Sequence, residues 1–293
     1  MKSRAILLAV SIAVTGCQTV APPPALEQRI DEIIGSASAA STVAVAYLEP
    51  STGRTLLRNA DEPFHAASTM KVPVMLAIFE AIDRGELRLD QSIPVRNDFV
   101  SIFDGSRYSM LAEEDSDPAL YELIGREATL EDLMTRMITR SSNLATNLLV
   151  DLVGAERIMT LMKSIGAEDI RVLRGVQDIK AYEAGMNNMV TAHGLMLVMQ
   201  KLLEKEAVSA SASGRMLDIL LRQEFNRGIP AGLPSGVRVA HKTGSITGHS
   251  HDAGIVYPPD GDPYILVVLT RNVNPGLASS LIAEISRAVW ESH

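Results

Sequence analysis

Strand-like segments lie near both ends of this 293-residue chain, and a long helical stretch separates them. Residues 42–48 are rich in β-branched side chains, and a Pro-Ser-Thr-Gly turn connects them to a candidate partner strand at 54–59. Three more strand-like segments occur late in the chain, at residues 236–245, 251–257 and 264–272. Strands at both ends around a helical middle predict one antiparallel sheet built from both termini.

The middle of the chain, about residues 118–205, repeats apolar side chains at intervals of three and four. We therefore predict an α+β protein in which an antiparallel sheet flanked by helices carries an inserted all-helical domain. The all-α domain is expected over residues 62–189, and the α/β domain over 30–61 and 190–293. A last amphipathic helix is expected from about Leu277 to Trp290.

The first residues are typical of a secretory signal. Lys2 and Arg4 precede the apolar run 5–14, which is too short to span a bilayer. The run ends in Val-Thr-Gly-Cys, which resembles a bacterial lipobox, the site at which a signal peptidase leaves a lipid-modified cysteine. We predict a lipoprotein signal peptide over residues 1–17 with Cys17 lipidated. An ordinary secretory peptide with an incidental cysteine is the alternative.

The segment after Cys17 predicts where the mature protein is held. Gln18, in place of aspartate, indicates sorting to the outer membrane by the same resemblance. Three prolines at 22–24 are typical of an extended spacer, so we predict a linker over residues 18–29. The mature protein is then periplasmic and touches the membrane only through its N-terminal lipid. We expect it to be a monomer.

Charge and cysteine content argue against several function classes. The chain has 27 basic and 35 acidic side chains, and two basic ones lie in the predicted signal, so the mature net charge is −10. An acidic protein without a basic stripe is a poor candidate for binding nucleic acid. Cys17 is the only cysteine, so neither a disulfide nor a cysteine metal site is expected.

Ser68 and Lys71 lie three positions apart in the segment Ala-Ala-Ser-Thr-Met-Lys-Val. Apolar residues recur at helical spacing after them, and Pro73 is tolerated only in a first helical turn, so Ser68 is expected near a helix N-terminus. One turn brings the hydroxyl and the amine to the same face. A desolvated amine can lose its proton and serve as base for a serine. Taken alone, a capping serine and a solvated lysine explain the pair as well.

Two further motifs change that balance. Ser141 and Asn143 form S-x-N, and Lys242, Thr243 and Gly244 form K-T-G at a strand end. S-x-x-K, S-x-N and K-T-G in this order are the signature of the penicillin-recognising serine hydrolases. The chain therefore resembles the class A β-lactamase family from about Val43 to Trp290.

Each of these residues has its own chemical reason to be there. Ser141 can relay a proton to a leaving nitrogen, and the amide of Asn143 can hold a substrate amide and a lysine. Lys242 and Thr243 offer a positive charge and a hydroxyl to a substrate carboxylate. Gly244 lets a ligand approach the strand backbone.

The resemblance implies roles beyond this chemistry. It makes Ser68 the acylated nucleophile, with its N–H as one oxyanion donor, and it places Ser245 beside the carboxylate site. The middle motif has Ser142 where the family usually carries an aspartate, which braces structure instead of touching substrate. We expect this departure to alter stability more than chemistry.

A second departure concerns release of the acyl-enzyme. The family uses a glutamate and an asparagine in the pattern E-x-x-x-N, and the usual separation from Ser141 leads to Gln177, which cannot act as a general base. Glu183 with Asn187 fits the pattern but lies later than expected, and Asp178 is a third candidate. A solvated glutamate and a helix-capping aspartate are the structural alternatives. Acylation is therefore better supported than rapid turnover.

Other polar residues carry weaker signals. Asp252 with three histidines resembles a zinc ligand set only loosely, because no metalloprotease helix motif accompanies it, and we predict no metal. The histidines are His241, His249 and His251. His251 and Asp252 are expected instead to shape the pocket wall. Tyr108 is a candidate gate over the substrate, or a packed loop tyrosine, and the run Glu113-Glu114-Asp115 is expected to be a solvated loop.

These expectations lead to one principal function. The protein is predicted to be a serine hydrolase of the class A β-lactamase type, which opens the β-lactam amide through an acyl-enzyme on Ser68 without metal or organic cofactor. Its substrate would be a β-lactam or a molecule like the peptidoglycan stem. The alternatives are a D-alanyl-D-alanine peptidase or esterase, a slowly deacylating penicillin-binding protein or sensor, and a purely structural lipoprotein.

Overall fold

The computed structural model describes residues 25–293. The predicted signal peptide with Cys17, and most of the predicted linker, lie outside these residues. Residues 26–29 of that linker are helical: α1 runs over Leu26–Gly35. The predicted linker is therefore too long. The helix already begins at Leu26, whose buried apolar side chain lies only two positions after the prolines.

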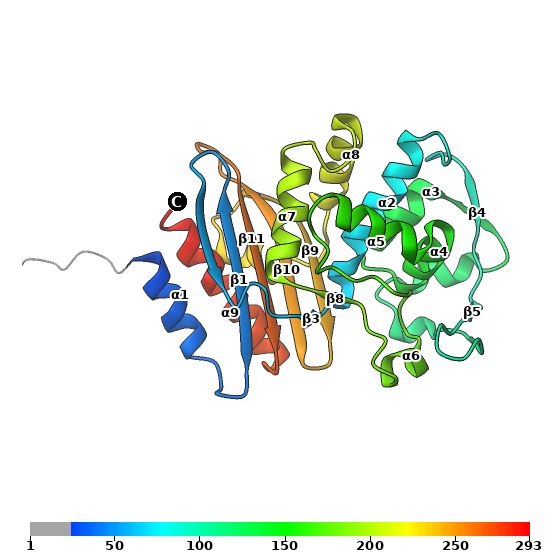
Figure 1. Ribbon diagram of the computed structural model, residues 1–293, viewed down its shortest axis with the longest axis horizontal. Helices are drawn as coiled ribbons and strands as arrows, with labels where there is room; N and C mark the ends of the chain where they lie inside the picture. Colours follow the sequence, from blue (N-terminus) through cyan, green and yellow to red (C-terminus); the bar gives the residue numbers. More distant parts are fainter. Residues whose placement is uncertain (1–24) are drawn as a thin grey trace, which may run out of the picture.

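Five antiparallel strands form the main sheet in the order β2-β1-β11-β10-β9 (Figure 1). They are β1 (Thr42–Glu49), β2 (Arg54–Arg58), β9 (Arg238–Ile246), β10 (His249–Tyr257) and β11 (Tyr264–Arg271). The N-terminal hairpin joins the C-terminal strands through the β1–β11 pair, in which Val45 lies opposite Val268. The predicted α+β class and the sheet built from both chain ends are confirmed.

The sheet separates two hydrophobic cores. Alternate residues of a strand point to opposite faces, so Val45 of β1 packs into the core with α1 and α9, whereas Ala46 packs into the other core. The helices that line these cores are α9 (Pro275–Trp290) on the first side and α7 (Ala192–Leu203) on the second (Figure 1).

The helical part of the chain lies beyond β9, at the far end of the sheet from α1 (Figure 1). Its helices are α2 (Lys71–Asp83), α3 (Leu130–Thr139), α4 (Asn143–Val153), α5 (Ala155–Ser164), α6 (Ile179–Glu183) and α8 (Ala210–Leu220). Helix α2 is its centre, because nearly all of its side chains from Lys71 to Phe79 are buried. No helix among the residues with assigned structure is long and apolar enough to cross a membrane.

Short strands and 3₁₀ turns interrupt the region predicted as all-α. The strand pairs are β3 (Phe64–His65) with β8 (Met189–Val190), β4 (Ser92–Pro94) with β7 (Glu127–Thr129), and β5 (Phe99–Val100) with β6 (Arg107–Tyr108). The 3₁₀ turns in this region are η1 (Ala67–Met70), η2 (Ala112–Glu114) and η3 (Pro118–Leu123), and a further one, η4 (Ile229–Gly232), lies outside it. The domain boundaries after residues 61 and 189 stay predictions.

Candidate active site

Ser68 lies in η1, directly before α2, where the helical part meets the sheet. The residue before it, Ala67, has a left-handed backbone with φ of 44°, a conformation that costs free energy for a residue with a side chain. Ser68 lines a cavity of about 360 Å³, together with residues of β9 and of the segment that leads into α6. The predicted nucleophile is therefore at the wall of a cavity between the two parts of the fold.

Lys71 begins α2 and is completely buried. Its Nζ donates hydrogen bonds to the Ser141 carbonyl oxygen at 2.7 Å, to Asn143 Oδ1 at 3.0 Å and to Ser141 Oγ at 3.2 Å. Burial, and then the charge of Lys242, hold the pKa of Lys71 well below its usual value, whereas Asp115 acts in the opposite direction. Burial and the Lys242 charge both favour the neutral amine, which is the form that can accept a proton.

The hydroxyl of Ser141 contacts a lysine from each of the other two motifs. Ser141 sits between α3 and α4 with a φ of 57°, and its Oγ lies within hydrogen-bonding distance of both the Lys71 and the Lys242 amines. Because an ammonium or amine donates to this oxygen from two sides, its own proton is available for a third group. That third group could be the leaving nitrogen of a substrate.

Lys242 is also completely buried, and burial lowers its pKa to about 7. Its Nζ lies 3.1 Å from Ser141 Oγ and 2.9 Å from the carbonyl oxygen of Thr243. Gly244 follows at a point of close approach, since a Cβ there would lie 3.1 Å from the backbone nitrogens of Ser68 and Thr69. Ser245 lines the same cavity as Ser68. The structure thus brings the three motifs together around one cavity.

The candidate bases for deacylation occupy different places. Asp178 lines the cavity but is 2% exposed, and its two carboxylate oxygens accept hydrogen bonds from Ser101 Oγ and from the backbone N–H groups of Ile102 and Ala181. It is the N-cap of α6. Glu183 is exposed at the end of α6 and does not line the cavity. Gln177 does line it, with a left-handed φ of 58°.

Tyr108 lies in the short strand β6 and is not among the residues that line the cavity. Its hydroxyl donates to the Val176 carbonyl oxygen at 3.3 Å and accepts from Asn147 Nδ2 at 3.2 Å. Burial raises the pKa of Tyr108 to about 12, so it stays protonated. These two bonds attach the ring to the segment around Val176, and its role as a gate over the substrate stays a prediction.

The histidines suggested as zinc ligands have other partners. His241 Nδ1 lies 2.8 Å from Asp252 Oδ1. His251 Nε2 donates to the His65 carbonyl oxygen and its Nδ1 accepts from the Thr270 N–H, so it is neutral. Across residues 25–293 no three potential metal ligands of the His, Cys, Asp or Glu type come together.

Two residues near the site escaped the sequence interpretation. Asp115 was expected in a solvated loop, but it is 7% exposed and binds the N-terminus of α4. His65 lines the cavity, and its Nδ1 accepts a hydrogen bond from the Ala67 N–H at 3.0 Å. No local pattern reveals either contact, although the histidine three positions before Ser68 is a signal that could have been followed.

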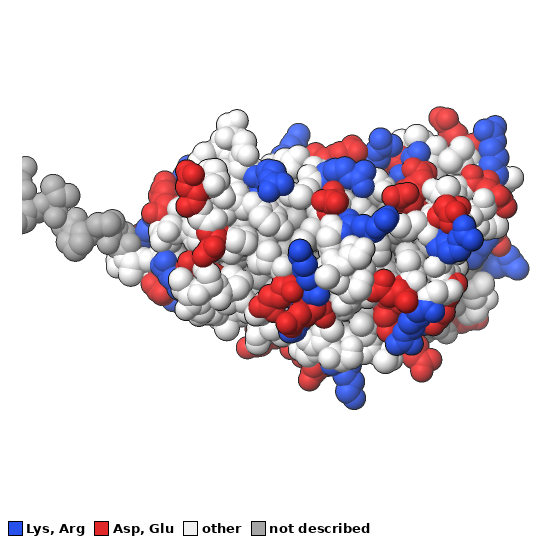
Figure 2. Space-filling view, turned by 90° about the horizontal axis from the view of Figure 1, so that it is seen from above, with Lys and Arg blue, Asp and Glu red and all other residues white. Residues whose placement is uncertain are grey.

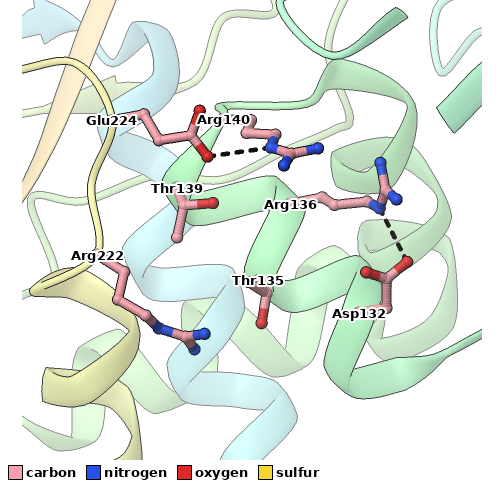
Figure 3. Close-up of a pocket in the computed structure, with 7 residues that line it drawn as sticks. All are labelled: Asp132, Thr135, Arg136, Thr139, Arg140, Arg222 and Glu224. Carbon is pink, nitrogen blue, oxygen red and sulfur yellow. Dashed lines mark hydrogen bonds and ion pairs between the residues drawn. The ribbon is translucent and has the colours of Figure 1, made fainter. Parts of the chain in front are cut away.

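On the face drawn in Figure 2, acidic and basic side chains are interspersed, and no large region carries charge of one sign. A second cavity, of about 250 Å³, lies on the helical part between α3 and the segment after α8 (Figure 3). Four of its charged side chains form ion pairs, Arg140 with Glu224 at 3.0 Å and Arg136 with Asp132 at 2.8 Å, and Arg222 donates to the carbonyl oxygen of Asp218. These groups have no reactive partner there.

Comparisons with known proteins agree on one family. The model of the β-lactamase enzyme family matches residues 25–293. The chain is 28% identical to a β-lactamase of Streptomyces fradiae over 255 residues, which covers 85% of this chain and 80% of that protein. The crystal structure of a β-lactamase from Sphaerobacter thermophilus is 30% identical with a TM-score of 0.76, covering 90% of this chain and 97% of the other. The structure of PBP-A is 28% identical with a TM-score of 0.77, covering 91% and 95%.

Proposed function

Because the chain belongs to the β-lactamase enzyme family, we propose that it is a serine hydrolase that opens the amide of a β-lactam through an acyl-enzyme on Ser68. One observation carries the proposal most directly: the Lys71 amine is buried, has a depressed pKa, and is bonded to Ser141 and Asn143 one helical turn after Ser68. An amine in this state is suited to accept the serine proton.

The proposed acylation step uses the residues gathered at this site. Ser68 Oγ attacks the lactam carbonyl carbon while its proton passes to Lys71. The proton then moves through Ser141 Oγ, 3.2 Å from the Lys71 amine, to the lactam nitrogen as the carbon–nitrogen bond breaks. The Ser68 N–H, which lies next to Gly244, stabilises the developing oxyanion. Lys242, with Thr243 and Ser245, holds the substrate carboxylate.

The acyl-enzyme is expected to be released slowly. Each oxygen of Asp178 already accepts hydrogen bonds from the protein, and Glu183 lies outside the cavity. Gln177, the neighbour of Asp178 at this wall, is an amide and cannot take a proton from water. Neither carboxylate is therefore well placed to act as the base.

Intact-mass measurement with benzylpenicillin tests the function. Wild-type protein should gain the mass of one penicillin, Ser68→Ala should gain none, and Ser164→Ala, a surface substitution on α5, should behave like wild type. Absence of an adduct on freshly mixed wild-type protein together with no β-lactam hydrolysis would contradict the proposal. An adduct that persists for hours would confirm the slow release, and loss of the adduct as fast as it forms would contradict it.

We also propose that the mature protein is a monomer in the periplasm, anchored by a lipid on Cys17. The support is the sequence alone: a charged start, a short apolar run and a glycine before the cysteine. Cys17→Ser should release the protein from the membrane fraction of cells. Retention of that variant in the membrane fraction would contradict the anchor, and light scattering of the mature domain tests the monomer.

A further inference from the structure

Asp115 occupies the N-terminus of α4, although it lies 28 positions before that helix. Its Oδ2 accepts hydrogen bonds from the backbone N–H groups of Asn143 at 2.9 Å and Leu144 at 2.8 Å, and its Oδ1 lies 3.0 Å from the first of these nitrogens. A helix leaves its first N–H groups without intrahelical partners and carries partial positive charge at this end. The carboxylate satisfies both needs.

The local cap is weak by comparison. Ser142, the N-cap residue, accepts only the Ala145 N–H, at 3.3 Å. A carboxylate at position 142 would be the local way to bring negative charge to this helix end. In this chain the charge arrives from another segment instead.

Asp115 is itself fixed from two sides. The Asp117 N–H donates to its Oδ1 at 3.0 Å, and the Tyr121 hydroxyl of η3 donates to its Oδ2 at 3.1 Å. The neighbouring Ser116 hydroxyl donates to the carbonyl oxygens of Arg140 at 2.6 Å and Ser141 at 3.1 Å. Residues 115–117 therefore hold the backbone on both sides of the left-handed Ser141.

We propose that Asp115 is a positioning residue of the active site, which holds the start of α4 so that Asn143 and Ser141 stay in contact with the Lys71 amine. This inference rests on the proposed function, because the contacts that Asp115 maintains are those of the acylation step. Asp115 touches no reacting atom and acts through the residues that do.

The charge of Asp115 also reaches Lys71. It raises the pKa of Lys71, whereas burial and the Lys242 charge from β9 lower it. The other titratable group facing Asp115 is Tyr121, whose pKa burial and the Asp115 charge raise further, so it remains a hydrogen-bond donor. Removing the carboxylate charge should therefore shift the protonation of Lys71 as well as loosen α4.

The test compares three variants. Asp115→Asn keeps the shape, removes the charge and turns an NH2 group toward a backbone N–H. Asp115→Asn combined with Ser142→Asp supplies a carboxylate locally. Asp117→Asn is the matched control: it removes the neighbouring buried carboxylate, which binds Arg136 at 2.9 Å and Arg140 at 3.5 Å but no N–H of α4.

The primary readout is the Lys71 pKa, followed by NMR of isotope-labelled lysine and assigned by loss of the signal in Lys71→Met. We expect Asp115→Asn to lower this pKa, the Ser142→Asp combination to restore at least half of the shift, and Asp117→Asn to leave it unchanged. In parallel, the rate of penicillin acylation should fall roughly tenfold in Asp115→Asn and recover in the combination.

An unchanged Lys71 pKa in Asp115→Asn, or an equal shift in Asp117→Asn, would overturn the inference. If Asp115→Asn does not fold, folding of the combination supports the inference and failure of both contradicts it. The titration needs no substrate. It therefore stays decisive if wild-type protein forms no penicillin adduct, an outcome that would overturn the proposed function instead.

Discussion

At the scale of single residues, the site depends on two buried lysines in different roles. Lys71 and Lys242 approach the same hydroxyl of Ser141, at 3.2 and 3.1 Å. Two ammonium groups in such a place would repel each other, and burial penalises both charges. The arrangement favours one neutral and one charged amine, as the proposed roles of Lys71 as the base and Lys242 as the ligand of the substrate carboxylate require.

The pKa of Lys242, about 7, predicts how substrate capture depends on pH. As the pH rises through 7 in the free protein, Lys242 loses its positive charge, so the KM for an anionic β-lactam should rise and kcat/KM should fall. In Lys242→Arg the fall of kcat/KM should occur only at much higher pH, because a guanidinium stays charged. If kcat/KM of Lys242→Arg still falls near pH 7, the fall is due to the titration of another group.

His65 predicts a second effect at the residue scale. Its Nδ1 accepts the Ala67 N–H and so helps to hold the left-handed turn that orients Ser68. His65→Leu, which removes the acceptor, should slow penicillin acylation about tenfold, and His65→Asn, whose side-chain oxygen can accept the same bond, should recover most of the rate. Equal rates in the two variants would show that this hydrogen bond is not needed.

At the scale of elements, the sequence pattern predicted the strands and helices that are periodic, and missed what depends on contacts between distant segments. The β-branched and apolar residues of 42–48 and 264–272, bounded by turn residues, led directly to β1 and β11. Asp115 could not be recognised, because an acidic run looks solvated until the helix end that it binds is known. Ser141 could be named as a site residue, but not its left-handed backbone, because serine gives no signal for it.

The segment that leads into α6 carries the prediction on turnover. Gln177→Glu would place a carboxylate at the cavity wall that is free of the hydrogen bonds that occupy Asp178. It should speed loss of the penicillin adduct by tenfold or more, on the order of what general-base catalysis supplies. Glu183→Gln should leave adduct lifetime unchanged, because Glu183 lies outside the cavity. A longer lifetime in Glu183→Gln would return that residue to the mechanism.

At the scale of the whole molecule, the buried His251 and the partly buried His65 connect the helical part to the sheet. His251 of β10 donates to the carbonyl oxygen of His65 in β3, and burial, the largest cause for each, lowers the pKa of both side chains to about 4. In the unfolded chain a histidine titrates near 6.5. Between these values the unfolded chain binds more protons than the folded one, so protonation favours unfolding.

The free energy of unfolding should therefore be at its full value above pH 6.5 and fall as the pH drops toward 4. Urea unfolding at several pH values measures this slope. His251→Asn removes one of the two titrating groups and should flatten the slope, whereas His193→Gln, a partly exposed position, should keep it. An equal slope in His251→Asn and wild type would assign the pH dependence to other groups.

The pairing of β1 with β11 has a consequence for how the chain is made. During synthesis the hairpin of β1 and β2 is complete early, but the free edge of β1 has no partner strand. That partner, β11, is made only after more than two hundred further residues. Closing so long a loop is entropically costly and is expected to be slow. A chain cut short before β11 would expose a bare strand edge, a template for aggregation, so quality control should recognise and degrade such fragments.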